Sequence, residues 1–446
     1  MSDGAGEDVD VEEAPAPPPR VNALSAAAIA RHNQRMRPLR GIYAAVLAVL
    51  AVAVVVIVVI AYTNGEISHV TLKTVAAGPT KVALQSPAST LTRKWTSTDS
   101  TAIGTPYDDG TVVTYDTHTV RGRNALTGKQ TWSYTRTDRA VCTAIQDQGV
   151  TVAVYALHGN CDELTAVSTD TGQRKWTRTL DKDGAEFDGP ASYSLQPGNA
   201  MFVSATSIYA VADEDNAGLD WWTFHHSGCT INSAVVGVAG ALISQTCTNE
   251  KCGDAKFCGD GKQLLLREAT TGTDDKSSTN HNNPDQIVWN LRNSDLVPVL
   301  AGRQIAARDP STGRLTLLDA TNGKSKGQLD LANRSGAVAT TFTSVLDADL
   351  IWSGGRTYAL KADTTAFAWH ADTGYLPTAI STDGSSPGNL ADARLAVATS
   401  RGITQLDGAD GRARHAFSVP APAPGSLVYP FGTGFIVAGQ TTTVYQ

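Results

Sequence analysis

The sequence predicts an all-β protein, an eight-bladed β-propeller with seven blades as the alternative. A short apolar strand, a polar turn that closes on Thr-Gly or an equivalent, and a second strand recur between Thr119 and Arg414. The period is about 42 to 54 residues, which is typical of propellers and solenoids. Each unit contains short β-branched runs that read as strands. No amphipathic helix of about 10 to 15 residues separates them, which argues against an α/β fold.

A glycine in the turn marks each repeat. Glycine tolerates a positive φ, so the chain can reverse tightly between the third and fourth strands of a blade. One repeat has lost this residue and carries Thr365 in its place. The marker glycines are Gly128, Gly172, Gly218, Gly272, Gly323 and Gly411.

A tryptophan follows the marker position at a constant spacing in several repeats. A ring at this place can cover the seam between neighbouring sheets and bury a large apolar area. These residues are Trp132, Trp176, Trp222 and Trp369. Even spacing of hairpins also occurs in β-sandwiches, so that fold is the alternative.

The two ends of the repeat region complete one blade. Trp95 and the residues before it look like the fourth strand of a repeat that lacks its first three strands. Residues 435–446 look like the early strands of a repeat that stops before its turn. Joining the two would remove exposed strand edges. This composite unit raises the expected number of blades to eight, and irregular joins in the longest intervals leave seven open.

The repeats resemble a known family. Leu317 to Gly323 and Tyr209 to Ala212 approach the signature Ala-Leu-Asp-Ala-x-Thr-Gly-x-x-x-Trp of propellers with PQQ-like repeats. The resemblance covers about residues 90 to 446. Members of this family include quinone-dependent dehydrogenases and non-enzymatic envelope proteins, among them a propeller lipoprotein that helps assemble outer-membrane barrels. The repeat is structural, so the resemblance alone does not imply bound quinone.

Residues 41–63 are predicted to form a transmembrane helix. Ile42 to Tyr62 carries no charge, and at about 1.5 Å per residue it spans roughly 30 Å, enough for a bilayer. A cleaved signal peptide would lie nearer the start and end in a small-residue site. Arginines precede the span, and no Lys or Arg follows it before Lys73. The positive-inside rule then places the N-terminus in the cytoplasm and the propeller outside.

The chain therefore divides into four expected parts. Residues 1–40 are acidic and then Pro-rich, so we expect a disordered cytoplasmic tail that ends in a basic juxtamembrane segment. Residues 41–63 are the membrane span. Residues 64–88 are expected to be a linker, and residues 89–446 the propeller.

All six cysteines follow the predicted span, on the side expected to be oxidising. Cys142 with Cys161 and Cys229 with Cys247 have similar spacings, and each pair is expected to link the first strand of a blade to the end of its second. Cys252 with Cys258 is expected to close an inserted loop. Fifteen pairings are possible for six cysteines, and a zinc site at Cys247, Cys252 and Cys258 is the rival interpretation.

The sequence does not predict a catalytic residue, a bound cofactor or a metal. It has no adjacent Cys-Cys pair and no Cys-x-x-Cys-His motif. Asp213 to Gly218 resembles a calcium loop only weakly, because the expected glutamate position holds Phe224. His225 and His226 are expected on an outer strand. The formal net charge of −7 argues against nucleic acid, which needs a basic surface.

The expected function is that of a single-pass membrane protein whose extracytoplasmic propeller binds or scaffolds proteins of a bacterial cell envelope. Its partners would be the lipid bilayer, through one helix, and an envelope protein. The expected working surfaces are a propeller face or the inserted loops Cys247 to Gly261 and Ser277 to Gln286, because loops on a rigid scaffold commonly carry binding sites. The alternatives are a quinone- or metal-dependent oxidoreductase and a transmembrane ligand sensor.

Overall fold

The computed structural model divides the chain into two units, Met1–Ser68 and His69–Gln446. The structure describes residues 46–54, 66–104, 110–147, 149–157, 160–180, 192–196, 199–212, 220–225, 228–248, 259–268, 287–331, 340–380 and 388–446. In the first unit, residues 46–54 are helical and exposed. Within the described ranges, no helix has both the length and the apolar character needed to span a bilayer. The tail at 1–40 and most of the span predicted at 41–63 lie outside these ranges.

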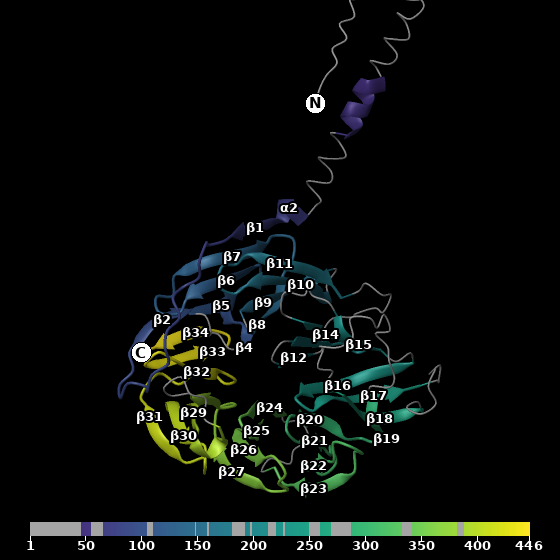
Figure 1. Ribbon diagram of the computed structural model, residues 1–446, viewed down its shortest axis with the longest axis vertical. Coiled ribbons are helices and arrows are strands. Elements are labelled where there is room, and N and C mark those ends of the chain that lie inside the picture. Colours follow the sequence, from purple (N-terminus) through teal and green to yellow (C-terminus); the bar gives the residue numbers. More distant parts are fainter. Residues whose placement is uncertain are drawn as a thin grey trace, which may run out of the picture. The chain divides into compact units, whose positions relative to one another are not determined.

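The second unit is a ring of β-sheets, and its described residues form eight of them (Figure 1). We number the sheets 1 to 8 in ring order. Sheet 1 contains β3 (Ser100–Thr101), β5 (Thr111–Tyr115), β6 (Thr119–Asn124), β7 (Gln130–Arg136) and β1 (Val70–Lys73). Sheet 2 contains β4 (Ile103–Gly104), β8 (Val141–Asp147), β9 (Val150–Leu157), β10 (Asn160–Ser168) and β11 (Arg174–Thr179). All described strand pairs are antiparallel except β4 with β8.

Sheets 3 to 7 each consist of four consecutive strands. Sheet 3 contains β12 (Ser192–Gln196), β13 (Asn199–Val203), β14 (Ser207–Ala212) and β15 (Asp220–His225). Sheet 4 contains β16 (Cys229–Gly237), β17 (Gly240–Cys247), β18 (Gly261–Arg267) and β19 (Ile287–Arg292). Sheet 5 contains β20 (Val297–Ala301), β21 (Ile305–Arg308), β22 (Leu315–Leu318) and β23 (Ser325–Leu329). Sheet 6 contains β24 (Thr340–Val345), β25 (Ala348–Ser353), β26 (Arg356–Lys361) and β27 (Phe367–Asp372). Sheet 7 contains β28 (Thr378–Ile380), β29 (Arg394–Thr399), β30 (Gly402–Asp407) and β31 (Ala413–Phe417), with the short 3-10 helix η2 (Leu390–Asp392) before β29.

Sheet 8 joins the two ends of the repeat region. It contains β32 (Leu427–Phe431), β33 (Gly434–Ala438) and β34 (Thr442–Tyr445) from the C-terminus and β2 (Arg93–Ser97) from the N-terminal side. Strand β2 pairs with β34 from Arg93 opposite Tyr445 to Ser97 opposite Thr442. Thr92 and Gln446 exchange backbone hydrogen bonds of 2.8 and 2.9 Å. The expected composite unit is therefore present as a sheet.

The marker turns have one local structure. The Gly323 N–H donates to the Asp319 carbonyl at 2.9 Å, while Asp319 Oδ1 accepts from the Thr321 N–H at 2.9 Å. Gly323 has a φ of 71°, in the left-handed region that glycine adopts without strain. The equivalent glycines of sheets 1, 2 and 7 have φ values of 69°, 72° and 69°. The side chain at the Asp position thus caps the turn, and the glycine completes it.

The tryptophans lie against these turns in the next sheet. The Trp132 indole N–H donates to the Thr169 carbonyl at 2.6 Å, and a Cβ added at Gly172 would be 2.6 Å from the Trp132 ring. Trp95 and Trp369 make the corresponding contacts with the turns of Gly128 and Gly411. Each ring therefore needs a glycine beneath it.

The seam between sheets 5 and 6 lacks both members of this pair. Gly327 of β23 occupies the tryptophan position, and Thr365 occupies the glycine position of the next sheet. A Cβ on Gly327 would be 3.6 Å from Thr365 Cβ, an ordinary contact. The two exceptions to the repeat pattern thus face each other. The side chain of Thr365 occupies the space that a tryptophan ring at position 327 would need.

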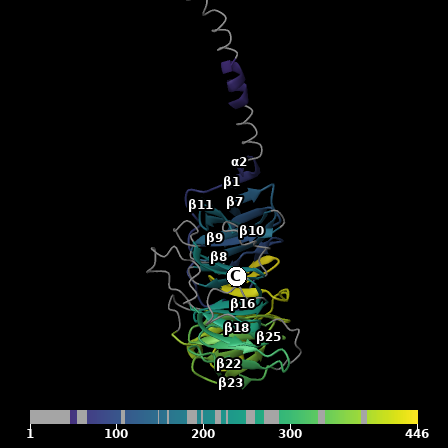
Figure 2. The ribbon, with the colours of Figure 1, turned by 90° about the vertical axis from the view of Figure 1, so that its right-hand side faces the viewer.

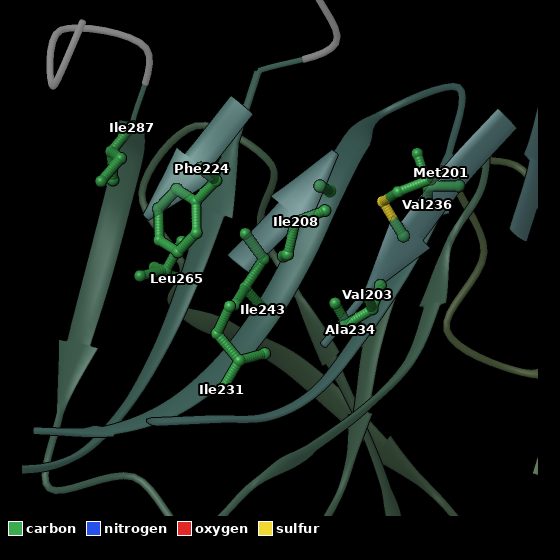
Figure 3. Close-up of a cluster of buried hydrophobic side chains, with 11 residues drawn as sticks. Met201, Val203, Ile208, Phe224, Ile231, Ala234, Val236, Ile243, Leu265 and Ile287 are labelled. Atoms are coloured by element: carbon green, nitrogen blue, oxygen red, sulfur yellow. The ribbon is translucent and has the colours of Figure 1, made fainter. Parts of the chain in front are cut away.

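Buried apolar clusters fill the space between neighbouring sheets all around the ring. Figure 3 shows one of them, in which Met201, Val203, Ile208 and Phe224 of sheet 3 pack on residues of sheet 4 such as Ile231 and Leu265. A cluster that includes Val112 of sheet 1 and Phe431 and Ile436 of sheet 8 joins the last sheet to the first. The core is therefore distributed over the seams.

The segment before β2, expected to be a linker at 64–88, is largely part of the propeller unit. After the short helix α2 (Glu66–His69), strand β1 pairs with β7, with Val70 opposite Arg136. The chain then donates backbone hydrogen bonds from Val75 to Thr171, from Gln85 to Gly432 and from Ala88 to Thr433, at 3.1, 2.9 and 2.8 Å. We call residues 74–91 the strap. It contacts sheets 2, 1 and 8 in turn.

Candidate functional site

The ring has two faces with different connections. Because successive strands are antiparallel, the connections between first and second and between third and fourth strands emerge on one face, which we call the turn face. The marker turns and the strap contacts lie there. The other connections emerge on the opposite face, which we call the disulfide face. Figure 2 views the sheets from the edge, with the strands running between the faces.

Two disulfides lie on the disulfide face. Cys142 is joined to Cys161 with a Cα–Cα distance of 6.0 Å, and Cys229 to Cys247 at 3.9 Å. Cys229 and Cys247 are directly opposite each other at the start of β16 and the end of β17, as the sequence predicts. Cys252 and Cys258 lie outside the described residues, so their pairing stays a prediction.

The position of the Cys142–Cys161 bond differs from the expectation. Cys161 was expected at the end of the second strand, whereas it lies at the start of the third strand, β10. The register shifts next to Cys142 in β8 and next to Cys161 in β10. These bulges bring the first and third strands within bonding distance.

A buried ion cluster lies beside this disulfide. The Arg136 side chain at the end of β7 is 0% exposed. Its Nε and Nη2 donate to the two carboxylate oxygens of Asp138, both at 2.9 Å, and its Nη1 donates to Glu163 Oε1 at 2.7 Å. Arg139 pairs with both acids as well. Tyr155 lies beneath, with its ring centroid 5.8 Å from Arg136 Cζ.

The cluster shifts the acidity of its members. The hydrogen bond from Arg136 lowers the pKa of Asp138 to about 2. Burial raises the pKa of Tyr155 well above its usual value. Both groups therefore keep one protonation state over the physiological pH range, which suits a rigid structural support.

A second ion cluster lies next to the first on the same face. Asp99 accepts from Arg121 and Arg123 at 3.1 and 2.7 Å, and Arg121 also pairs with Asp116. The His118 Nδ1 contacts the Arg139 carbonyl at 2.9 Å. The exposed residues Thr117 and His118 therefore lie on a turn that is fixed from both sides.

These groups do not form a catalytic arrangement in the part of the chain that the structure describes. The charges are joined in ion pairs, and no described set of three or more His, Cys, Asp or Glu could hold a metal ion. The strands at the inner edges of the eight sheets, as far as the structure describes them, include no Asp or Glu. The arrangement supplies rigid, charged loops of the kind used in protein recognition.

The structure describes only some of the other residues singled out in the sequence. Trp176 of β11 packs with Phe202 and Tyr209 of sheet 3. Trp222 lies in β15, but its side chain is not described, and Gly218 and Gly272 lie outside the described ranges together with Asp213 and His226. Most of the loop Cys247 to Gly261 and the whole of Ser277 to Gln286 likewise lie outside the described residues.

One seam residue was not predicted from the sequence. Trp289 of β19 donates to the Ala320 carbonyl at 3.0 Å and lies against Gly323. It is separated from its own marker, Gly272, by an insertion, so the constant spacing does not find it. Its distance in sequence to the next marker, which resembles that from Trp95 to Gly128, was the available signal.

Fold and repeat together define the chain as a propeller of PQQ-like repeats. A family model described as "Outer membrane protein assembly factor BamB" matches residues 56–244 and 259–416. The chain belongs to this family, and the resemblance found in the sequence is confirmed. No curated protein sequence matches the chain significantly.

Solved structures match the chain at low sequence identity. BamB from Moraxella catarrhalis is 16% identical, with 80% of this chain and 99% of that chain covered and a TM-score of 0.42. Chaetomium thermophilum Sqt1, bound to the N-terminus of ribosomal protein L10, is 12% identical, with 78% and 97% covered and a TM-score of 0.50. A quinohemoprotein alcohol dehydrogenase from Pseudomonas putida is 13% identical, with 82% and 78% covered and a TM-score of 0.45. At these identities the likeness concerns the fold alone.

Proposed function

We propose that this protein is a single-pass membrane protein whose eight sheets form the blades of a closed, extracytoplasmic propeller that binds or scaffolds envelope proteins. Residues 1–40 would be a cytoplasmic tail and residues 41–63 the anchor. The repeat tryptophans and glycines would serve the scaffold and not a ligand.

The observation that carries the proposal is a face with two disulfides, where the Cys142–Cys161 bond lies next to ion clusters whose charges are already paired. Disulfides persist in oxidising compartments outside the cytosol. Charges held in pairs on a rigid rim suit recognition of another protein, whereas a dehydrogenase would need a carboxylate or cofactor site. Family membership supports the same role.

The disulfide face is the proposed binding face. The strap and the tight marker turns already use much of the backbone on the turn face of sheets 8, 1 and 2. The β17–β18 connection, which includes the predicted loop Cys247 to Gly261, leaves from the disulfide face, whereas the β18–β19 connection leaves from the turn face.

The test uses the full chain in bacterial cells. We expect it to stay in the membrane after alkaline carbonate extraction, and an amine reagent that cannot cross the membrane should label the propeller but not an N-terminal tag. After crosslinking, a second envelope protein should co-purify in mild detergent. Extraction by carbonate would contradict the anchor, and repeated recovery of the chain alone would contradict the scaffold.

A further inference from the structure

We propose that the disulfide face of sheets 1 and 2 is turned towards the membrane that holds the anchor, and that the partner bound there is an integral membrane protein contacted through a short extracytoplasmic loop. The inference deepens the proposed function and rests on its membrane anchor. Three observations carry it: the place at which the chain enters the propeller, the short segment before that place, and the balance of charge around it.

The chain enters the propeller at a corner of the disulfide face. Strand β1 starts at Val70, opposite Arg136 at the end of β7, and runs from there towards the turn face. The His69 carbonyl accepts from the Thr137 N–H at 3.0 Å and from the Thr137 hydroxyl at 3.3 Å. Residues 137–140 connect β7 to β8 on the disulfide face, so the entry point belongs to this face.

The exposed turn at Thr117 and His118 lies beside the entry point. The Arg136 N–H donates to the His118 carbonyl at 2.9 Å, and the next residue along the chain, Thr137, is the one that binds His69. The turn and the entry point are therefore both fixed to the end of β7. A molecule that contacts this turn lies close to the place where the chain arrives from the proposed anchor.

The segment between the proposed anchor and this corner is short. Residues 64–68 alone separate them, and five residues reach at most about 17 Å when fully extended. Helix α2 shortens this reach, because a helix rises only about 1.5 Å per residue. A small domain is about 30 Å across, whereas a helix with its side chains is about 10 to 12 Å wide. The space beside the corner thus admits a loop or a helix end of a membrane-embedded protein but not a separate soluble domain.

The charges around the entry point favour a protein loop over lipid headgroups. The surfaces that attract anionic headgroups are polybasic. The two ion clusters on this part of the face instead balance, because each of their four arginines is paired with one or more of four carboxylates. The arginines are Arg121, Arg123, Arg136 and Arg139, and the carboxylates are those of Asp99, Asp116, Asp138 and Glu163.

The orientation is tested on the full chain in phosphatidylcholine nanodiscs whose lipids carry a spin label on the headgroup. A fluorescent amino acid replaces Thr117 or, as the matched control, Leu126. Leu126 is exposed on the marker turn of the same sheet. The six residues of β6 lie between the two connections, and a strand of this length spans about 20 Å. We expect the lipids to quench the probe at position 117 and to leave the probe at position 126 almost unchanged. Equal quenching, or stronger quenching at 126, would overturn the inference.

A longer tether tests the physical cause. A flexible insertion of about twenty Gly and Ser residues after Asn64 adds a mean separation of about 25 Å. The chain should stay in the disc, and the probe at position 117 should lose most of its quenching. Unchanged quenching in this variant would contradict the role of the short segment.

The class of partner is tested in intact cells with a photoreactive amino acid at position 117. A protease site replaces part of the segment 64–68, so that its length is kept. After crosslinking, the membranes are treated with the protease and extracted with alkaline carbonate. The propeller that is not crosslinked should be released, whereas the adduct should stay in the membrane, held by its partner. Release of the adduct, adducts with lipid alone, or no adduct would each overturn the assignment of an integral partner.

Carbonate extraction of the uncut native chain separates this inference from the proposed function. If the native chain is extracted, the proposed anchor fails and the inference fails with it. If the chain stays in the membrane while the probes at positions 117 and 126 are quenched equally, the anchor stands and only the inference is overturned.

Discussion

At the scale of single residues, Arg136 is the central cation of the buried ion cluster on the disulfide face. It is fully buried and bridges Asp138 and Glu163, which come from a connection and from the neighbouring sheet. Arg136→Met would leave these carboxylates without their buried partner and should lower the free energy of unfolding by about 3 to 5 kcal/mol. Urea unfolding with intact disulfides measures this loss.

Arg314→Met is the matched control for Arg136→Met. Arg314 and Asp330 are 42% and 51% exposed, and such surface pairs contribute at most about 1 kcal/mol. Equal losses in the two variants would show that the buried cluster is not a special support of the face.

The lowered pKa of Asp138 predicts a specific dependence of the protein's stability on pH. Its pKa falls from 3.8 to about 2 in the folded protein, so its contribution to stability is fully present above the unfolded value. The contribution is lost as pH falls from about 4 towards 2. The melting temperature of the native chain should therefore drop more steeply in this window than that of Asp138→Asn. Parallel curves would contradict the assignment.

At the scale of elements, the Trp-on-Gly seam explains the repeat. Gly411 has a φ of 69°, and an added Cβ would be 2.6 Å from the Trp369 ring. Gly411→Ala should therefore cost at least about 1 to 3 kcal/mol, the usual cost of a strained backbone position. Gly388→Ala, where an added Cβ meets nothing within 4 Å, should be nearly neutral. The melting temperatures of the two variants measure this difference, and equal values would contradict the Trp-on-Gly explanation.

The exceptional seam between sheets 5 and 6 offers a reciprocal test. Gly327→Trp should destabilise the chain, because the ring meets Thr365, and Thr365→Gly in the same chain should restore part of the loss. Contacting residues show coupling energies of roughly 0.5 to 3 kcal/mol in such double-mutant cycles. Strict additivity of the two changes would argue that the two positions do not face each other as described.

The sequence predicts these elements well where one local pattern determines them. The turn glycines and the sheet joined from both termini could be found because each follows from spacing and from β-strand pairing. Trp289 could not be found by spacing within its own repeat, since an insertion separates it from Gly272. The strand assignment of Cys161 failed because bulges in β8 and β10 depend on tertiary contacts that have no local signal.

At the scale of the whole molecule, the strap supports the seam that closes the ring. Val82 of the strap packs on the cluster between sheets 8 and 1. No periodic pattern marks residues 74–91, so we expected a linker there. Their position is determined by contacts with three sheets. The ion clusters were missed for the same reason, because Arg136 and Glu163 meet only in the folded ring.

A charge placed in the strap tests this role. Val82→Asp should lower the free energy of unfolding by about 1 to 3 kcal/mol, because it buries part of a polar group without a partner. Val238→Asp, at a site that is 59% exposed, should have little effect. If both variants melt with the native chain, the strap does not hold the closing seam.

The face used for partner binding is tested most directly by photo-crosslinking of the full chain in intact cells. A photoreactive amino acid at the exposed Thr117 reports on the disulfide face, and one at the exposed Thr321 reports on the turn face. We expect a discrete adduct with another envelope protein from position 117 and none from position 321. Adducts from position 321 alone, or from neither position, would contradict the proposed binding face.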